Sequence, residues 1–328
     1  MRPKSEMYMK RCCISCLLVL LCEVCLAQGS SAFQFLRLPI SARAAALGGE
    51  NISALADDPT LAFHNPALLS AVSERQLSLG GMTYMQGTTL ASASYNLRPG
   101  DRSALAFGGR YLGFGDMTQA DVNGEILGEF GAKDMALTTA YSYDFSDTWS
   151  GGVGASFIYS NYDIVWSLAL GVDLGLNYFN PDNGLSFSLL AARLGGQVRT
   201  YDGTTERLPT NIMAGFSKSL AHAPVRFSLT LTDLNRWSAA DFYGTDGSFS
   251  DILLRHVVVG AELFPTDNLW LGIGYNQRLH SELSSGGRSL AGFSLGGGIE
   301  LSRLRFGISY SRYHVAANSL LMNISYSL

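Results

Sequence analysis

Alternating apolar and polar residues are the dominant pattern of this 328-residue chain after residue 74. From Leu168 to Tyr178 every second residue is apolar, and the residues between them are small or polar. A period of two places the two kinds of side chain on opposite faces of a β-strand. The pattern recurs in segments of roughly ten residues, the length of a tilted membrane-spanning strand. It predicts fourteen strands, near residues 75–84, 88–97, 103–113, 132–145, 148–160, 163–179, 185–193, 208–220, 224–234, 252–264, 268–279, 290–301, 303–313 and 318–328.

The connections between these predicted strands alternate in length. After even-numbered strands they are short, as at Ser146-Asp147 and Ser302. After four of the odd-numbered strands they are long, polar and rich in glycine, near 114–131, 194–207, 235–251 and 280–289. This alternation is typical of outer-membrane barrels, which have short turns on the periplasmic side and longer loops outside the cell.

Lipid offers no hydrogen-bond partner to backbone N–H and C=O groups, so a sheet that spans a bilayer must close on itself. We therefore predict an all-β fold, a transmembrane antiparallel β-barrel of about fourteen strands formed by residues 75–328. It is expected in the outer membrane, with the N- and C-termini periplasmic. A soluble all-β protein is the alternative, although it gives no reason for the long connections to gather on one side.

Residues 28–74 lack this alternation and predict short helices. An alanine-rich turn at Ser41–Leu47 ends at Gly48-Gly49. Asp58-Pro59 predicts the start of a second helix, and Asn65-Pro66 the start of a third, because capping side chains and a proline at the first position suit a helix start. We predict that this segment is an N-terminal helical plug or hatch inside the barrel. A hatch that touches only the barrel rim is the alternative.

The first 27 residues have the features of a secretory signal peptide. Basic residues precede an apolar run from Ile14 to Leu21, and Cys25-Leu26-Ala27 resembles a signal-peptidase site. The run is too short to cross a bilayer as a helix. We expect cleavage after Ala27; a lipoprotein anchor at Cys22 or Cys25 is the alternative.

Composition removes several classes of function. All five cysteines lie in the first 27 residues, which excludes disulfides, thiolate catalysis and cysteine-ligated zinc from the expected mature chain. The whole chain has 23 basic and 27 acidic residues, and the expected mature chain has 19 and 25. This negative balance cannot neutralise a phosphate backbone, so no nucleic-acid partner is expected.

Catalytic and metal-binding signals are weak. Residues 292–296 match the Gly-x-Ser-x-Gly nucleophile pattern of hydrolases, but they lie within an alternating strand that no helix follows. The five histidines are scattered without the spacing of metal ligands. Residues 121–125 resemble part of a calcium loop and are better explained as a turn. We predict no enzymatic activity, no metal site and no cofactor.

Two polar residues on one predicted strand indicate a lumen. Asp173 and Asn177 lie on the polar face of the segment 163–179. An ionised carboxylate that faced lipid would be costly, so these residues are expected to face the lumen, where they contact the plug or line a path.

Residues 35–70 resemble a known family. The stretch Phe35–Gly49 and the elements that follow it are similar to the N-terminus of the PorV/PorQ family. The element Asn65-Pro66-Ala67 is also similar to the FadL-type transporters of hydrophobic compounds, which have fourteen strands after an N-terminal hatch. The candidate plug motif consists of Arg37, Pro39, Arg43, Gly48, Gly49, Asp58, Pro59, His64, Asn65 and Pro66.

The resemblance implies an outer-membrane component of the type IX protein secretion system of Bacteroidota. Such a barrel is not an enzyme and works with other secretion and surface-attachment proteins during export of cargo. Its expected partners are outer-membrane lipid, other type IX secretion proteins and cargo. A FadL-like channel for uptake of hydrophobic compounds is the alternative, and porin-like diffusion is disfavoured by the plug.

Overall fold

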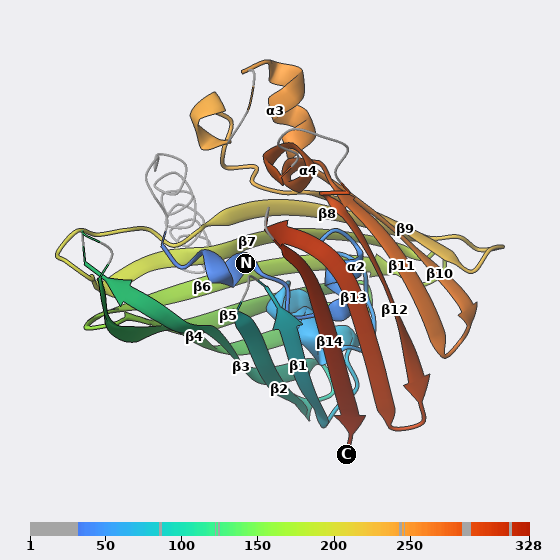
Figure 1. Cartoon of the computed structure of the whole chain (residues 1–328). Coiled ribbons are helices and arrows are strands. Elements are labelled where there is room, and N and C mark those ends of the chain that lie inside the picture. Colours follow the sequence, from blue (N-terminus) through green and yellow to red (C-terminus); the bar gives the residue numbers. More distant parts are fainter. Residues whose placement is uncertain are drawn as a thin grey trace, which may run out of the picture.

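The computed structural model describes residues 32–84, 87–121, 123, 125–242, 245, 247–283, 290–314 and 317–328, so the predicted signal peptide lies outside the described residues. The described chain forms a closed antiparallel barrel of fourteen strands, in which β1 pairs with both β2 and β14 (Figure 1). The predicted fold class is confirmed. The strands are β1 (Gln76–Thr83), β2 (Thr89–Gly100), β3 (Ser103–Ala120), β4 (Ile126–Asp144), β5 (Trp149–Tyr162), β6 (Val165–Asn180), β7 (Leu185–Arg199), β8 (Asn211–Ser219), β9 (Val225–Leu231), β10 (Val257–Thr266), β11 (Leu269–Asn276), β12 (Phe293–Leu301), β13 (Leu304–His314) and β14 (Ala317–Ser327).

The period-two pattern separates the outside of the barrel from its inside. On β14, Met322 and Ile324 face outward and are exposed, whereas Asn323 and Ser325 are buried inside. The same division holds on β1, where Leu77 and Leu79 are exposed and Ser78 is buried. An outer wall of exposed apolar side chains suits contact with hydrocarbon, and a polar inner face suits a filled lumen.

The connections separate onto two rims of the barrel. Short connections at 101–102, 145–148, 181–184, 220–224, 267–268 and 302–303 form what we call the short-turn rim. The longest connections, at 200–210, 232–256 and 277–292, lie on the opposite rim, which we call the long-loop rim. The helices α3 (Phe249–Arg255) and α4 (Gln277–Leu283) stand above this rim in Figure 1.

These two helices correct two of the predicted strand boundaries. β10 begins at Val257 and not near residue 252, because the Ser248 side chain caps α3 and Arg255 pairs with Asp251 at 2.9 Å one turn away. The helix α4 likewise replaces the end of the strand predicted at 268–279.

The predicted loop at 114–131 is mostly an extension of β3 and β4 beyond the rest of the wall. Its turn is held by the Asp121 carboxylate, which accepts hydrogen bonds from the backbone N–H groups of Asn123 at 2.9 Å and Glu125 at 2.8 Å. The prediction of a loop over 114–131 is thus wrong for most of its length, whereas these two bonds agree with the interpretation of residues 121–125 as a turn.

Short helices occur before β1 where the sequence predicts them. The side chains of Ser41, Asp58 and Asn65 each accept a hydrogen bond from a backbone N–H group in the first turn that follows. The second and third helices are 3-10 helices, and a further one precedes the predicted set. Their bounds are η1 (Gln34–Arg37), α2 (Ala42–Ala46), η2 (Pro59–Phe63) and η3 (Pro66–Ala71), while η4 (Ala239–Asp241) lies in the β9–β10 connection.

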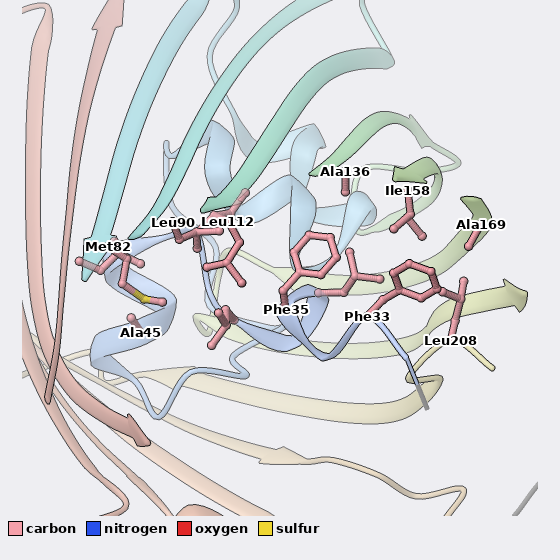
Figure 2. Close-up of a cluster of buried hydrophobic side chains, with 14 of the residues drawn as sticks. Phe33, Phe35, Ala45, Met82, Leu90, Leu112, Ala136, Ile158, Ala169 and Leu208 are labelled. Atoms are coloured by element: carbon pink, nitrogen blue, oxygen red, sulfur yellow. The ribbon is translucent and has the colours of Figure 1, made fainter. Parts of the chain in front are cut away.

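Residues 32–75, which we call the plug, lie inside the barrel. Figure 2 shows Phe33, Phe35 and Ala45 of the plug among inward-facing side chains of the wall, such as Leu112 and Ile158. These side chains belong to one continuous buried apolar cluster. The plug therefore fills the lumen as a packed core and is not confined to the rim.

The plug crosses the lumen from one rim to the other. The N–H group of Ala32 donates to Arg207 in the β7–β8 connection at 3.1 Å, on the long-loop rim. The N–H group of Leu328 donates to Arg75 at 2.9 Å, on the short-turn rim. The first and last described residues therefore lie on opposite rims, because the plug passes once along the barrel before β1 begins. The expected N-terminus of the mature chain lies outside the described residues, so the predicted location of both termini in the periplasm stays a prediction.

Candidate functional site

The contacts between the plug and the barrel wall form the candidate site, and a buried carboxylate is at its centre. Asp233 follows β9 in a left-handed conformation with φ 55°, and its side chain is fully buried. Its oxygens accept hydrogen bonds from Arg37 of the plug at 2.6 Å and from Arg278 of α4 at 2.5 Å. A third cation, Arg236, lies 3.8 Å away. One carboxylate therefore joins the plug to two connections of the long-loop rim.

The charges around Asp233 keep it ionised. Burial alone raises the pKa of this carboxyl, but the guanidinium groups of Arg37 and Arg278 overcome burial and hold the pKa well below its usual range. Asp233 in turn raises the pKa of Arg278 above its ordinary value, against the effect of burial. The interaction is therefore between full charges at neutral pH.

A second buried carboxylate holds the middle of the plug. Glu262 on β10 pairs with Arg226 of β9 at 2.5 Å and lies 3.5 Å from Arg43 of the plug. Arg226 also donates to the backbone oxygen of Leu55 at 2.5 Å. The Arg43 guanidinium lies over the ring of Trp270 at 4.7 Å, a cation–π contact.

Wall side chains also satisfy the plug backbone. Asn323 accepts from the N–H group of Ala42 at 2.6 Å and donates to the carbonyl oxygen of Ile40 at 2.9 Å. Ser294 accepts from the N–H group of Gly48 and donates to the carbonyl oxygen of Ala46, both at 2.9 Å. Because unpaired buried backbone groups are costly, these bonds fix the position of α2 in the lumen.

At the short-turn rim, Asp57 joins the end of the plug to the wall. Its carboxylate accepts hydrogen bonds from Arg305 of β13 at 2.6 Å and from Gln76 of β1 at 2.5 Å. The plug is thus anchored by ionic contacts at both rims and near its middle.

A small cavity remains between the plug and the β3–β8 side of the wall. Its volume is about 50 Å³. We call it the lumen cavity, and its charged and titratable lining residues are Arg37, Glu50, His64, Arg110, Asp173 and Arg193.

The structure brings only some of the predicted residues together. Arg37, His64 and Asp173 line the lumen cavity, and Asp173 accepts a hydrogen bond from the N–H group of Arg193 at 2.7 Å. Asn177 also faces inward, but its side-chain oxygen accepts from Ser186 and does not line the cavity. The other motif residues lie along the plug. Arg43, Gly48 and Asn65 lie against the wall, and Gly49 (φ 91°) lies against Tyr313. Asp58 and Pro66 occupy helix starts, and Pro39 and Pro59 are buried.

The sequence reasoning missed the wall partners of these residues. Asp233, Glu262, Arg110 and Arg193 come from separate strands or connections, so no spacing links them to the plug. Composition was one signal, since the expected mature chain has 17 arginines and 2 lysines. Arginine is the cation preferred for buried ion pairs.

His64 predicts a measurable acid sensitivity. Burial, with a smaller effect from the charges of Arg110 and Arg193, lowers the pKa of His64 to about 3 from 6.5. Between about pH 6.5 and pH 3 the imidazole of His64 binds a proton in the unfolded chain but not in the folded one. The stability of the folded protein is therefore greatest with respect to this group above about pH 6.5, and it decreases as the pH falls toward 3. The free energy of unfolding of the wild-type protein should fall between pH 7 and pH 4. We expect His64→Gln to reduce this fall by about 2–3 kcal/mol. The shift in gel mobility between folded and unfolded barrel monitors the unfolding.

The exposed His222 in a short turn provides the matched control. The substitution His222→Gln should leave the difference between pH 7 and pH 4 unchanged. An equal acid response in the wild-type protein and in His64→Gln would contradict the assignment.

The long-loop rim carries an exposed apolar surface. Trp237 and Phe249 stack with their ring centroids 6.4 Å apart and are 46% and 71% exposed. Leu253 and Leu254 on α3 are also exposed. These four side chains, which we call the α3 patch, belong to the same β9–β10 connection as Asp233.

The weak catalytic and metal signals find no support in the described residues. Ser294 of the Gly-x-Ser-x-Gly motif lies within β12 and bonds the plug backbone, as noted above. The described residues contain no group of three histidine, cysteine or acidic side chains that suits a metal ion. None of the described helices is long and apolar enough to cross a membrane.

Comparisons with known proteins identify the architecture. No protein family model and no curated protein sequence matches the chain. The Pseudomonas putida toluene transporter TodX has a TM-score of 0.56 at 14% identity, over 90% of this chain and 98% of that one. A Pseudomonas aeruginosa FadL homologue has 0.54 at 11% identity, over 88% and 98%. The CymD monoaromatic hydrocarbon channel has 0.51 at 13% identity, over 90% and 98%. The chain is thus similar in fold to FadL-type barrels.

Proposed function

We propose that this chain is an outer-membrane barrel that acts through protein partners, as a component of the type IX protein secretion system. Two observations support the proposal: the resemblance of residues 35–70 to the PorV/PorQ family, and a lumen that a plug fills and ionic contacts hold at both rims. The second observation carries it, because a packed and charged lumen suits a rigid docking body better than a conduit.

The outer wall supports the location. Its exposed apolar side chains match the lipid-facing band of outer-membrane barrels. In this proposal the short-turn rim faces the periplasm and the long-loop rim faces the outside of the cell. The α3 patch on the long-loop rim is then available to a partner, and the chain itself performs no catalysis.

Deletion of the gene tests the proposal. We expect secreted cargo to accumulate in the periplasm, because export or surface attachment loses one component. Complementation with the wild-type chain should restore export, and a variant with Trp237→Ser and Phe249→Ser should restore it poorly while still assembling in the membrane. Normal export in the deletion strain would rule out this function.

The solved structures favour a second candidate more directly: a FadL-like channel for hydrophobic compounds, since TodX and CymD are described as a transporter and a channel. The closed wall and the lumen cavity of about 50 Å³ argue that the plug would have to move first. An apolar cavity that holds one benzene molecule has about 150 Å³.

Uptake by vesicles separates the two candidates. A channel should accelerate the entry of toluene or a long-chain fatty acid into vesicles that contain the purified protein, relative to empty vesicles. The secretion component should not, and it should give no steady ion conductance in planar bilayers. Accelerated uptake together with normal cargo export would establish the second candidate.

A further inference from the structure

The lumen cavity carries more positive than negative charge. Its lining includes three guanidinium groups, from Arg37, Arg110 and Arg193, and two carboxylates, from Glu50 and Asp173. Arg37 shares Asp233 with two other arginines, so that carboxylate is already fully used. The formal balance of the lining is therefore +1.

The carboxylates that line the cavity do not pair with two of these arginines. Among the described residues, neither Arg110 nor Arg193 has a carboxylate oxygen within 4.0 Å of a guanidinium nitrogen. Arg110 donates to the carbonyl oxygens of Leu36 and Leu38, and Arg193 donates to that of Pro209. These neutral acceptors satisfy hydrogen bonds, but neither guanidinium is directly paired with a carboxylate, and Asp173 acts on both only from beyond 4.0 Å.

Three polar nitrogens of the same cavity have no protein partner. They are Nη1 of Arg37, Nη2 of Arg193 and Nε2 of His64, and each is buried from solvent. A buried polar group without a partner destabilises the fold, and a charged group does so more strongly. Three such atoms around one cavity indicate a ligand that accepts hydrogen bonds.

We propose that the lumen cavity binds one small monovalent anion of halide size. The Nη groups of Arg37 and Arg193 and the Nε2–H group of His64 donate to it, and Arg110 adds a nearby positive charge. Water accepts the same hydrogen bonds but does not balance the charge, which matters in a low-dielectric interior. The cavity, about 50 Å³ in volume, has room for an ion of this class together with water.

The bound anion links the plug to the wall. Arg37 and His64 belong to the plug, whereas Arg110 lies on β3 and Arg193 on β7. The ion is thus a fourth ionic contact between the plug and the wall. The stability of the plugged barrel should depend on halide concentration, and this holds whichever function the barrel performs.

Crystals of the mature protein grown in bromide provide the direct test. We expect one anomalous peak inside the barrel, within hydrogen-bond distance of Arg193 and Arg37. In solution, replacing sodium gluconate by sodium chloride at constant ionic strength should raise the unfolding temperature by about 2–5 °C in a saturable manner. Gluconate is too large for the cavity and serves as the inert anion.

Substitution assigns the effect to the cavity. Arg193→Gln brings the lining to neutrality, so it should abolish the chloride dependence and the bromide peak. The control is Arg199→Gln, on the same strand but exposed over the ring of Trp166, and it should retain both. If Arg193→Gln does not fold, Arg110→Gln serves in its place. No bromide peak and no chloride dependence in the wild-type protein would mean that the cavity holds water only and would overturn the proposal.

Discussion

Replacing Asp233 by asparagine is expected to loosen the plug by about 3–5 kcal/mol, the usual effect of removing one partner from a buried ion pair. Arg37, Arg236 and Arg278 would then share one buried site without its carboxylate. Asparagine keeps the size of the side chain and tolerates the left-handed backbone at this position, so the effect reports the charge and not the shape.

Limited trypsin digestion in detergent measures the loosening. Cleavage after Arg37 or Arg43 requires the plug to leave the lumen, so its rate follows the population of the open form. We expect this rate to rise by about two to four orders of magnitude in Asp233→Asn. The hydrogen bonds between the strands do not depend on Asp233, so the barrel of the variant should still migrate differently on a gel before and after heating.

Asp202→Asn is the matched control, because this carboxylate lies fully exposed in the β7–β8 connection. It should leave the digestion rate unchanged. The wild-type protein should itself lose protection progressively below about pH 4, measured with pepsin because trypsin is inactive there, since Asp233 stabilises the plug only while it is ionised and its pKa in the folded protein is depressed. Equal digestion of Asp233→Asn and the wild-type protein would show that the plug is held by packing alone.

The sequence predicts the barrel because the residues of each strand alone show which of its faces contacts lipid and which contacts the lumen. Lipid on one side and the lumen on the other force alternation, as between Met322 and Asn323, and short turns interrupt it at regular distances. The prediction is wrong where local signals compete. Residues 252–256 are apolar enough for a strand, but the Ser248 cap and the Asp251–Arg255 pair favour a helix.

The site was less predictable, because its contacts join distant parts of the chain. Arg37 and Asp233 are 196 positions apart, and Arg305 and Asp57 are 248 apart. The resemblance of residues 35–70 drew attention to Arg37, Arg43 and the helix starts, but it gave no information about wall residues. Inward charge on strands, which identified Asp173, was a usable signal that also applies to Arg110, Arg193 and Glu262.

Glycines on the inner wall, finally, set how closely the plug can approach. A Cβ atom at Gly152 on β5 would lie 2.3 Å from the backbone carbon of Pro66, and one at Gly175 on β6 would lie 2.1 Å from Asn65 Oδ1. Backbone atoms of η3 cannot rotate away as a side chain can. Gly152→Val should therefore displace η3 and break the 3.1 Å hydrogen bond from Ser150 to Ala67.

Valine suits a strand, so the wall itself should tolerate the substitution and the damage should fall on the plug. The displaced η3 should also lose the hydrogen bonds that the Arg98 guanidinium donates to the carbonyl oxygens of Ser70 and Val72. We expect purified Gly152→Val to give steady ion conductance in planar bilayers where the wild-type protein gives none, and to be cleaved rapidly by trypsin after Arg43 of the plug. Gly81→Val is the control, because a Cβ atom there meets nothing within 4 Å on the outer face of β1. A closed barrel in both variants would mean that η3 is not what seals the lumen, and that the packing of α2 against β11–β13 alone keeps it shut.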